Sequence, residues 1–95
     1  SPTIFVPNQL MGAPSGKNVT LECSVEAHPR AISYWNFNNS MVLATNEKYI
    51  STMMENSYRT NMQLTIRNLQ PSDFGNYRCI SKNSLGETEG SIRLY

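Results

Sequence analysis

Two cysteines and a single histidine are the side chains of this sequence with the most distinctive chemistry. Cys23 and Cys79 lie far apart in the chain, and His28 stands beside Pro29. A zinc site needs three or four histidine, cysteine or carboxylate ligands, and a serine or cysteine nucleophile needs an adjacent base. We therefore expect no metal, no cofactor and no catalytic residue, and we interpret His28 as an ordinary loop residue.

The carboxylates indicate structure rather than catalysis. Asp73 is the only aspartate, and the glutamates form no dense loop of oxygen ligands of the kind that binds calcium. We interpret Asp73 as a structural residue at a corner of the chain and expect it to pair with a cation such as Arg59. An enzyme is therefore not expected.

The composition limits the partners. Eight Lys and Arg against seven Asp and Glu leave a formal net charge of +1, so neither nucleic acid nor an anionic membrane is favoured as a partner. With 39% apolar and 16% charged residues the chain is expected to fold. No apolar run is long enough to span a bilayer. We expect residues 1–95 to be one domain cut from a longer protein, with no small-molecule substrate.

Alternation of apolar and polar residues with a period of two predicts an all-β protein. It recurs in segments 19–25, 62–66, 77–81 and 92–94, and turn residues separate these segments. Only Gln70 to Asp73 reads as a short helical turn. The predicted strands lie near 3–6, 9–12, 17–27, 31–37, 41–45, 48–53, 60–67, 75–83 and 86–94.

Both cysteines occupy inward positions of predicted strands, as does Trp35. Inward cysteines on separate strands suggest a disulfide between Cys23 and Cys79 that joins two sheets, with Trp35 packed against it. Closing so long a loop stabilises by about 4 kcal/mol in the chain-entropy model. The alternative is two buried thiols in a cytosolic protein.

The segment before the second cysteine resembles the E–F corner of immunoglobulin domains. Its pattern is Asp73-x-Gly75-x-Tyr77-x-Cys79, in which the tyrosine hydroxyl bonds to upstream backbone and the glycine avoids a clash. The resemblance covers nearly the whole chain and implies an immunoglobulin-like β-sandwich with two antiparallel sheets and Greek-key topology. The structural residues it implies are Cys23, Trp35, Leu64, Asp73, Gly75, Tyr77 and Cys79.

The spacing favours the intermediate, or I-set, type of this fold. Between Trp35 and Leu64 there is room for a C′ strand and a D strand but not for the C″ strand of variable domains. Pro7 interrupts the first strand, so we expect it to leave one sheet and join the other. Gly86 is expected to take a positive φ in the F–G hairpin.

A closer resemblance extends over most of the chain. The sequence is similar to the third, membrane-proximal immunoglobulin domain of insect Dpr-interacting proteins, neuronal surface proteins related to IgLONs and lachesin. This resemblance implies three tandem domains, a membrane anchor, and Dpr-like immunoglobulin partners that bind through another domain. The segments that carry it are 6–13, 18–23, 26–29, 34–35, 73–79 and 82–95.

Two tripeptides satisfy the N-glycosylation sequon, namely those that begin at Asn18 and at Asn38. Val19 is expected to face inward, so Asn18 should face outward. Asn38 falls in the turn after a predicted strand. Both asparagines are therefore predicted glycosylation sites, and they favour an extracellular, cell-surface protein.

The outward rows of two neighbouring strands form a candidate interface. Ile32 and Tyr34 on one strand lie beside Arg78 and Ile80 on the other, an apolar patch rimmed by cations. Single exposed apolar residues are also normal on protein surfaces. Three functions therefore remain open: a structural spacer in a cell-surface recognition protein, a module that binds a protein through this face, and an intracellular I-set domain of a muscle or cytoskeletal protein.

Overall fold

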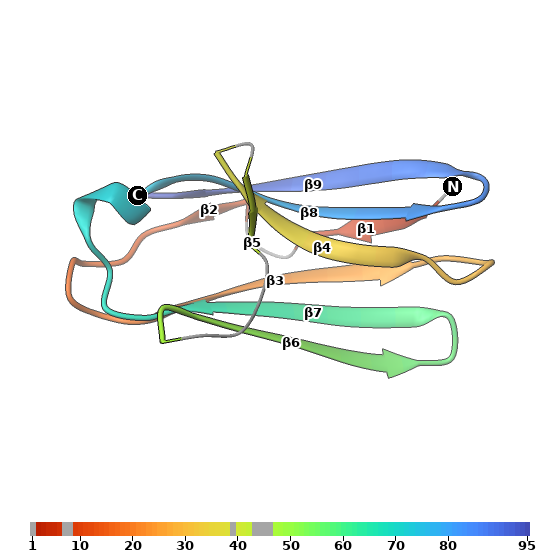
Figure 1. The fold of residues 1–95 in the computed structure, drawn as a ribbon, viewed down its shortest axis with the longest axis horizontal. Helices are drawn as coiled ribbons and strands as arrows, with labels where there is room; N and C mark the ends of the chain where they lie inside the picture. The colour runs from red at the N-terminus through yellow and green to blue at the C-terminus, as the bar shows by residue number, and fades with distance from the viewer. Residues whose placement is uncertain (1, 7–8, 39, 43–46) are drawn as a thin grey trace.

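The computed structural model describes residues 2–6, 9–38, 40–42 and 47–95. It contains two facing β-sheets (Figure 1), with strand orders β1-β3-β7-β6 and β2-β9-β8-β4-β5. The elements are β1 (Thr3–Phe5), β2 (Leu10–Met11), β3 (Val19–Glu26), β4 (Ile32–Phe37), β5 (Ser40–Val42), β6 (Tyr49–Asn56), β7 (Arg59–Ile66), the 3-10 helix η1 (Pro71–Asp73), β8 (Gly75–Asn83) and β9 (Gly86–Leu94).

The predicted strands agree with these elements to within a few residues at each end, and those near 75–83 and 86–94 agree at both ends. Part of the strand predicted at 41–45 lies outside the described residues. Within the described part of the chain, no helix is long and apolar enough to cross a membrane.

The first strand is divided between the two sheets, as predicted. β1 pairs antiparallel with β3, whereas β2 pairs parallel with β9. Pro7, the residue on which the prediction rested, lies outside the described residues. The β2–β9 pair is a parallel exception in sheets predicted to be antiparallel.

The middle of the chain has the strands expected of the I-set type. Between β4 and β7, the described residues form β5, which pairs with β4, and β6, which pairs with β7. The F–G hairpin is also as predicted: Asn83 pairs with Gly86, which has a φ of 157°. In the second sheet, β4, β8 and β9 therefore lie side by side.

The core lies between the sheets and follows the alternation seen in the sequence. In β7, Met62, Leu64 and Ile66 are fully buried, while the residues between them are not. The same alternation in β3 buries Leu21 and Cys23. One apolar cluster therefore holds the two sheets together.

The sandwich is elongated, and the chain enters and leaves it at opposite ends. Its principal extents are 39 × 22 × 21 Å. Thr3 lies opposite Glu26, at the end of β3, whereas Leu94 lies opposite Gly75, at the start of β8. The N and C labels stand at opposite ends of the long axis (Figure 1). We call the end at Thr3 the entry end and the end at Leu94 the exit end.

Candidate functional site

The two cysteines form the predicted disulfide. Cys23 of β3 is bonded to Cys79 of β8, with 6.5 Å between their Cα atoms, so the bond joins the two sheets. Trp35 lies opposite Cys79 in the β4–β8 ladder and is 1% exposed. The disulfide and the buried tryptophan of the sequence analysis are confirmed, and both belong to the core rather than to a reactive site.

The exit end holds the corner that the sequence pattern predicted. The Tyr77 hydroxyl donates a buried hydrogen bond of 2.7 Å to the main-chain oxygen of Asp73. The ring of Tyr77 stacks on Phe37, with 4.2 Å between the ring centroids. Gly75 has a φ of 149°, and a Cβ there would lie 3.2 Å from the Phe37 ring. The backbone conformation therefore favours glycine, and the space beside Phe37 is tight for any larger residue.

The side chain of Asp73 is buried and pairs with a cation other than the predicted one. Its Oδ2 accepts a 2.8 Å hydrogen bond from the Gln70 main-chain N–H and forms an ion pair with Lys48. Arg59 instead pairs with Glu26, its neighbour in the β3–β7 ladder at the entry end. The predicted Asp73–Arg59 pair is wrong because the two residues lie at opposite ends of the sandwich.

Two tyrosines at this corner have raised pKa values. Burial raises the pKa of Tyr77 well above that of a free tyrosine, and interactions with Tyr49 and with Asp73 raise it further. Burial also raises the pKa of Tyr49, and the charge of Asp73 adds to the effect. Both hydroxyls are neutral near pH 7, so they supply hydrogen bonds and not an acid–base pair.

The candidate interface on β4 and β8 differs from its prediction. Ile32 is 75% exposed, and Tyr34 and Arg78 are half-buried, but Ile80 is only 6% exposed. The ladder places Ile80 between Tyr34 on β4 and Glu89 on β9, so that neighbouring strands flank it on both sides. The predicted exposed patch is therefore wrong at Ile80.

Charged side chains surround what remains of this face. Lys82 lies opposite Glu87, and Ile80 lies opposite Glu89. Ile32 is the one exposed large apolar residue that the described residues of β4 and β8 present. The described part of this face is therefore a mixed surface, with one exposed apolar side chain among charged ones.

Both sequon asparagines are exposed. The Oδ1 atom of Asn18 accepts a 2.9 Å hydrogen bond from the main-chain N–H of Asn68, whereas a glycan is attached through the nitrogen of the side chain. Asn38 lies in the turn after β4 with a φ of 50°. Asn39, the middle residue of the second sequon, lies outside the described residues.

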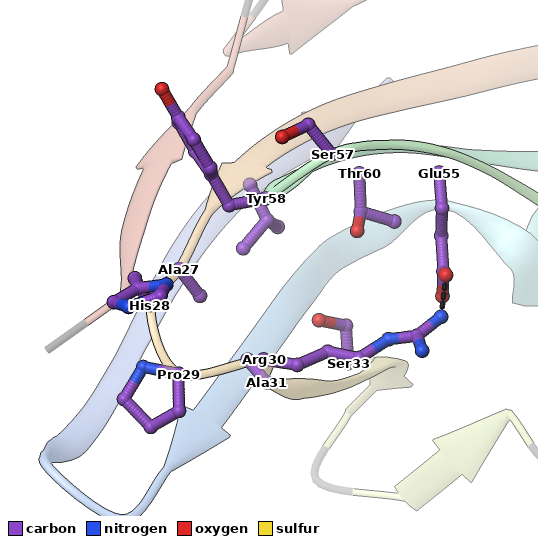
Figure 2. A pocket seen from close by; sticks show the side chains of 11 residues that line it. Ala27, His28, Pro29, Arg30, Ala31, Ser33, Glu55, Ser57, Tyr58 and Thr60 are labelled. Carbon is purple, nitrogen blue, oxygen red and sulfur yellow. Dashed lines mark ion pairs between the residues drawn. The ribbon is translucent and has the colours of Figure 1, made fainter.

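A cavity at the entry end was not anticipated from the sequence. It has a volume of about 630 Å³ and lies between the β3–β4 loop and the β6–β7 turn. Figure 2 shows the ion pair of Arg30 and Glu55 at one side of it and Tyr58 at another. The cavity is formed by segments far apart in the sequence, so no local motif marks it. Among the described residues, no group of three His, Cys, Asp or Glu could hold a metal ion.

Comparison with known proteins gives the family. A family model described as an immunoglobulin domain matches residues 1–83, and the chain belongs to the immunoglobulin domain family. This agrees with the two-sheet sandwich, the disulfide and the tyrosine corner.

Several curated proteins are similar to the chain. Lachesin of Drosophila melanogaster is 29% identical over 100% of this chain and 26% of its own length. Human transmembrane and immunoglobulin domain-containing protein 1 is 31% identical over 88% of this chain and 30% of its own length. The chain thus spans between a quarter and a third of the length of these relatives.

Solved structures are similar over nearly the whole chain. A chain in the crystal structure of Dpr2 Ig1-Ig2 in complex with DIP-Theta Ig1-Ig3 has a TM-score of 0.94 and 45% identity, over 99% of this chain and 32% of that one. Titin domains A168-A170 give a TM-score of 0.83 and 25% identity, over 98% of this chain and 31% of that one.

Proposed function

We propose that this immunoglobulin domain is a structural spacer in the ectodomain of a neuronal cell-surface recognition protein, and that it is the third, membrane-proximal domain of three. The observation that carries the proposal is that the chain enters and leaves at opposite ends of a 39 Å long sandwich. A domain with this geometry separates its neighbours by its own length. The anchor and the partner-binding domain belong to other parts of the protein.

The similarity to the Dpr2 and DIP-Theta complex supports this assignment. The matched region is about a third of the matched chain, which is the share of one domain in a chain of three. The partners proposed for the whole ectodomain are therefore Dpr-like immunoglobulin proteins, bound through another domain. On this domain, the charged surroundings of Ile32 favour the spacer over a recognition face.

The disulfide and the sequons support an extracellular location. A buried disulfide is stable in the oxidising secretory pathway and rare in the cytosol, and both sequon asparagines are exposed. The competing intracellular function rests on the similarity to titin at 25% identity, which is lower than the 45% of the Dpr2 and DIP-Theta complex.

Expression of the full-length protein in insect cells tests the location. Treatment with peptide-N-glycosidase should lower the mass of the protein, and Asn18→Gln and Asn38→Gln should each remove one glycan. Alkylation without reductant should leave Cys23 and Cys79 unmodified. Free thiols in native protein that carries no glycan would instead establish the intracellular alternative.

Binding measurements test the spacer role. Sedimentation should show a monomeric domain, and surface binding should detect no tight complex between this domain and Dpr-type ectodomains. The second candidate function, binding through the β4–β8 face, is favoured only by the exposure of Ile32. Micromolar or tighter binding that is lost in Ile32→Glu and Tyr34→Ala would establish that function and refute the spacer.

A further inference from the structure

The entry end combines an open cavity with exposed apolar side chains. Apolar residues that line the cavity of about 630 Å³ include Val25 of β3 and Ala27 and Ala31 of the β3–β4 loop. The ion pair of Arg30 and Glu55 lies at its side (Figure 2). An apolar floor with polar groups around it is the arrangement typical of a protein interface.

Two large exposed side chains lie at the entry end, one of them in the lining of the cavity. Tyr58, in the turn between β6 and β7, is 63% exposed and lines the cavity. Leu85, in the turn between β8 and β9, is also 63% exposed. The Asn83 side chain donates a 2.8 Å hydrogen bond to the main-chain oxygen of Pro29, which fixes the β8–β9 turn against the β3–β4 loop. The two apolar side chains therefore belong to one end surface.

The path of the chain indicates what reaches this surface. The Thr88 hydroxyl donates a 2.7 Å hydrogen bond to the main-chain oxygen of Pro2, which holds the incoming chain against β9. Thr3 then begins β1 at the entry end. Any domain that precedes this one in the polypeptide is consequently brought to the entry end and not to the sides of the sandwich.

We propose that the entry end, with its cavity, seats the preceding immunoglobulin domain of the same polypeptide, with Tyr58 as the main contact and Leu85, on the separate β8–β9 turn, as a second. This proposal rests on the proposed function, because it requires a tandem ectodomain. Tyrosine and arginine are, with tryptophan, enriched among the residues that dominate binding energy at interfaces. Tyr58 and Arg30 both line this cavity. The contact makes the spacer a rigid one, since it fixes the angle between the two domains.

Hydroxyl-radical footprinting of the full-length ectodomain tests the proposal. In the single domain the Tyr58 side chain is 63% exposed. Its oxidation rate in the folded ectodomain should be several-fold lower than the rate expected for a side chain of that exposure. Tyr77, which is fully buried, serves as the protected reference. The reduced and urea-unfolded protein gives the exposed reference. Oxidation of Tyr58 at the rate of an exposed side chain would overturn the proposal.

A pair of variants provides a second readout in the full-length ectodomain. Tyr58→Asp should increase hydrogen exchange in the β3–β4 loop and broaden the distribution of sizes in small-angle X-ray scattering. Leu10→Asp is the matched control, because Leu10 is 64% exposed and lies near the exit end. Equal effects of the two variants, or no effect of either, would refute the proposed contact with the preceding domain. Retained near-ultraviolet circular dichroism shows that each variant is folded.

Failure of this proposal can be distinguished from failure of the proposed function. An exposed Tyr58 in a glycosylated ectodomain would mean a flexible junction in an extracellular spacer. Tight partner binding through Ile32 would refute the spacer without changing the oxidation rate of Tyr58. A full-length protein with no domain before Ser1 would directly refute the proposed contact with a preceding domain.

Discussion

The hydroxyl of Tyr77 donates a 2.7 Å hydrogen bond to the carbonyl oxygen of Asp73, which lies four residues earlier in the chain. The bond joins the end of η1 to β8 and satisfies a buried acceptor. The Asp73 side chain in turn accepts from the main-chain N–H of Gln70 at the start of η1. Asp73 thus stabilises the connection between β7 and β8 through two hydrogen bonds, one to its main-chain oxygen and one to its side chain.

Tyr77→Phe should lower the free energy of unfolding by about 1–2 kcal/mol, because it leaves the buried carbonyl of Asp73 without its donor. Urea unfolding of the two proteins measures the effect. Tyr58→Phe is the control, since the Tyr58 side chain is 63% exposed and should give an unchanged midpoint. Equal midpoints for all three proteins would show that the corner bond contributes nothing.

Stability should fall above about pH 10, the ordinary pKa of tyrosine. The pKa values of Tyr77 and Tyr49 are raised in the folded state, mainly by burial. Their contribution is therefore fully present below the pKa of the unfolded chain and is lost as the pH rises toward the folded pKa. Urea midpoints across this range should fall less steeply for Tyr77→Phe than for the wild type. If the urea midpoints of Tyr77→Phe and the wild type fell in parallel with pH, the ionisation of Tyr77 would not be coupled to unfolding.

Lys48→Met should destabilise the protein by about 2 kcal/mol, because it leaves the buried Asp73 carboxylate without its cation. Lys48 is partly exposed, so water moderates the loss. Arg59→Met removes the more exposed pair with Glu26 and should have a much smaller effect. Thermal unfolding of the two variants decides the matter, and the reverse order would refute the importance of the corner pair.

Gly90→Ala should destabilise by about 1–3 kcal/mol through overpacking. A Cβ at Gly90 would lie 2.6 Å from Val6 Cγ2, 3.0 Å from Ile4 Cγ2 and 3.3 Å from Cys79 Sγ. The added methyl group must displace the side chain of Val6 and crowds that of Ile4. Urea unfolding measures the loss of stability.

The matched control for this prediction is Gly12→Ala. The atoms nearest to its Cβ would be those of the Tyr95 ring, at 3.3 Å, and that side chain is 64% exposed. A destabilisation as large as that of Gly90→Ala would show that general loss of glycine flexibility, and not the clash, is responsible.

The core could be predicted because few arrangements of strands bury all the apolar positions of the alternating pattern. Cys23, Trp35 and Cys79 are at inward positions of strands, and burial of large apolar groups fixes which face points inward. The tyrosine corner was predictable for a different reason, since Gly75 and Tyr77 act within one local segment. Local constraints of this kind can be read from a single sequence.

Contacts that depend on two distant strands could not be predicted. The pairing of Asp73 with Lys48 depends on β6 lying antiparallel to β7, which brings the start of β6 beside η1, and the sequence alone does not give that pairing. Ile80 faces outward as expected but is buried, because exposure depends on the lengths of its neighbours Tyr34 and Glu89. To predict the cavity at the entry end, the positions of the β3–β4 loop and the β6–β7 turn would both have to be known.

The division of the first strand between two sheets has a mechanical consequence. β2 runs parallel to β9, and the Arg93 and Tyr95 main-chain N–H groups donate to the main-chain oxygens of Gln9 and Met11 at 2.8 and 2.9 Å. Tension applied at Thr3 and Tyr95 would pull these neighbouring strands in opposite directions along their length. The hydrogen bonds are then loaded in shear and must break together instead of opening one at a time.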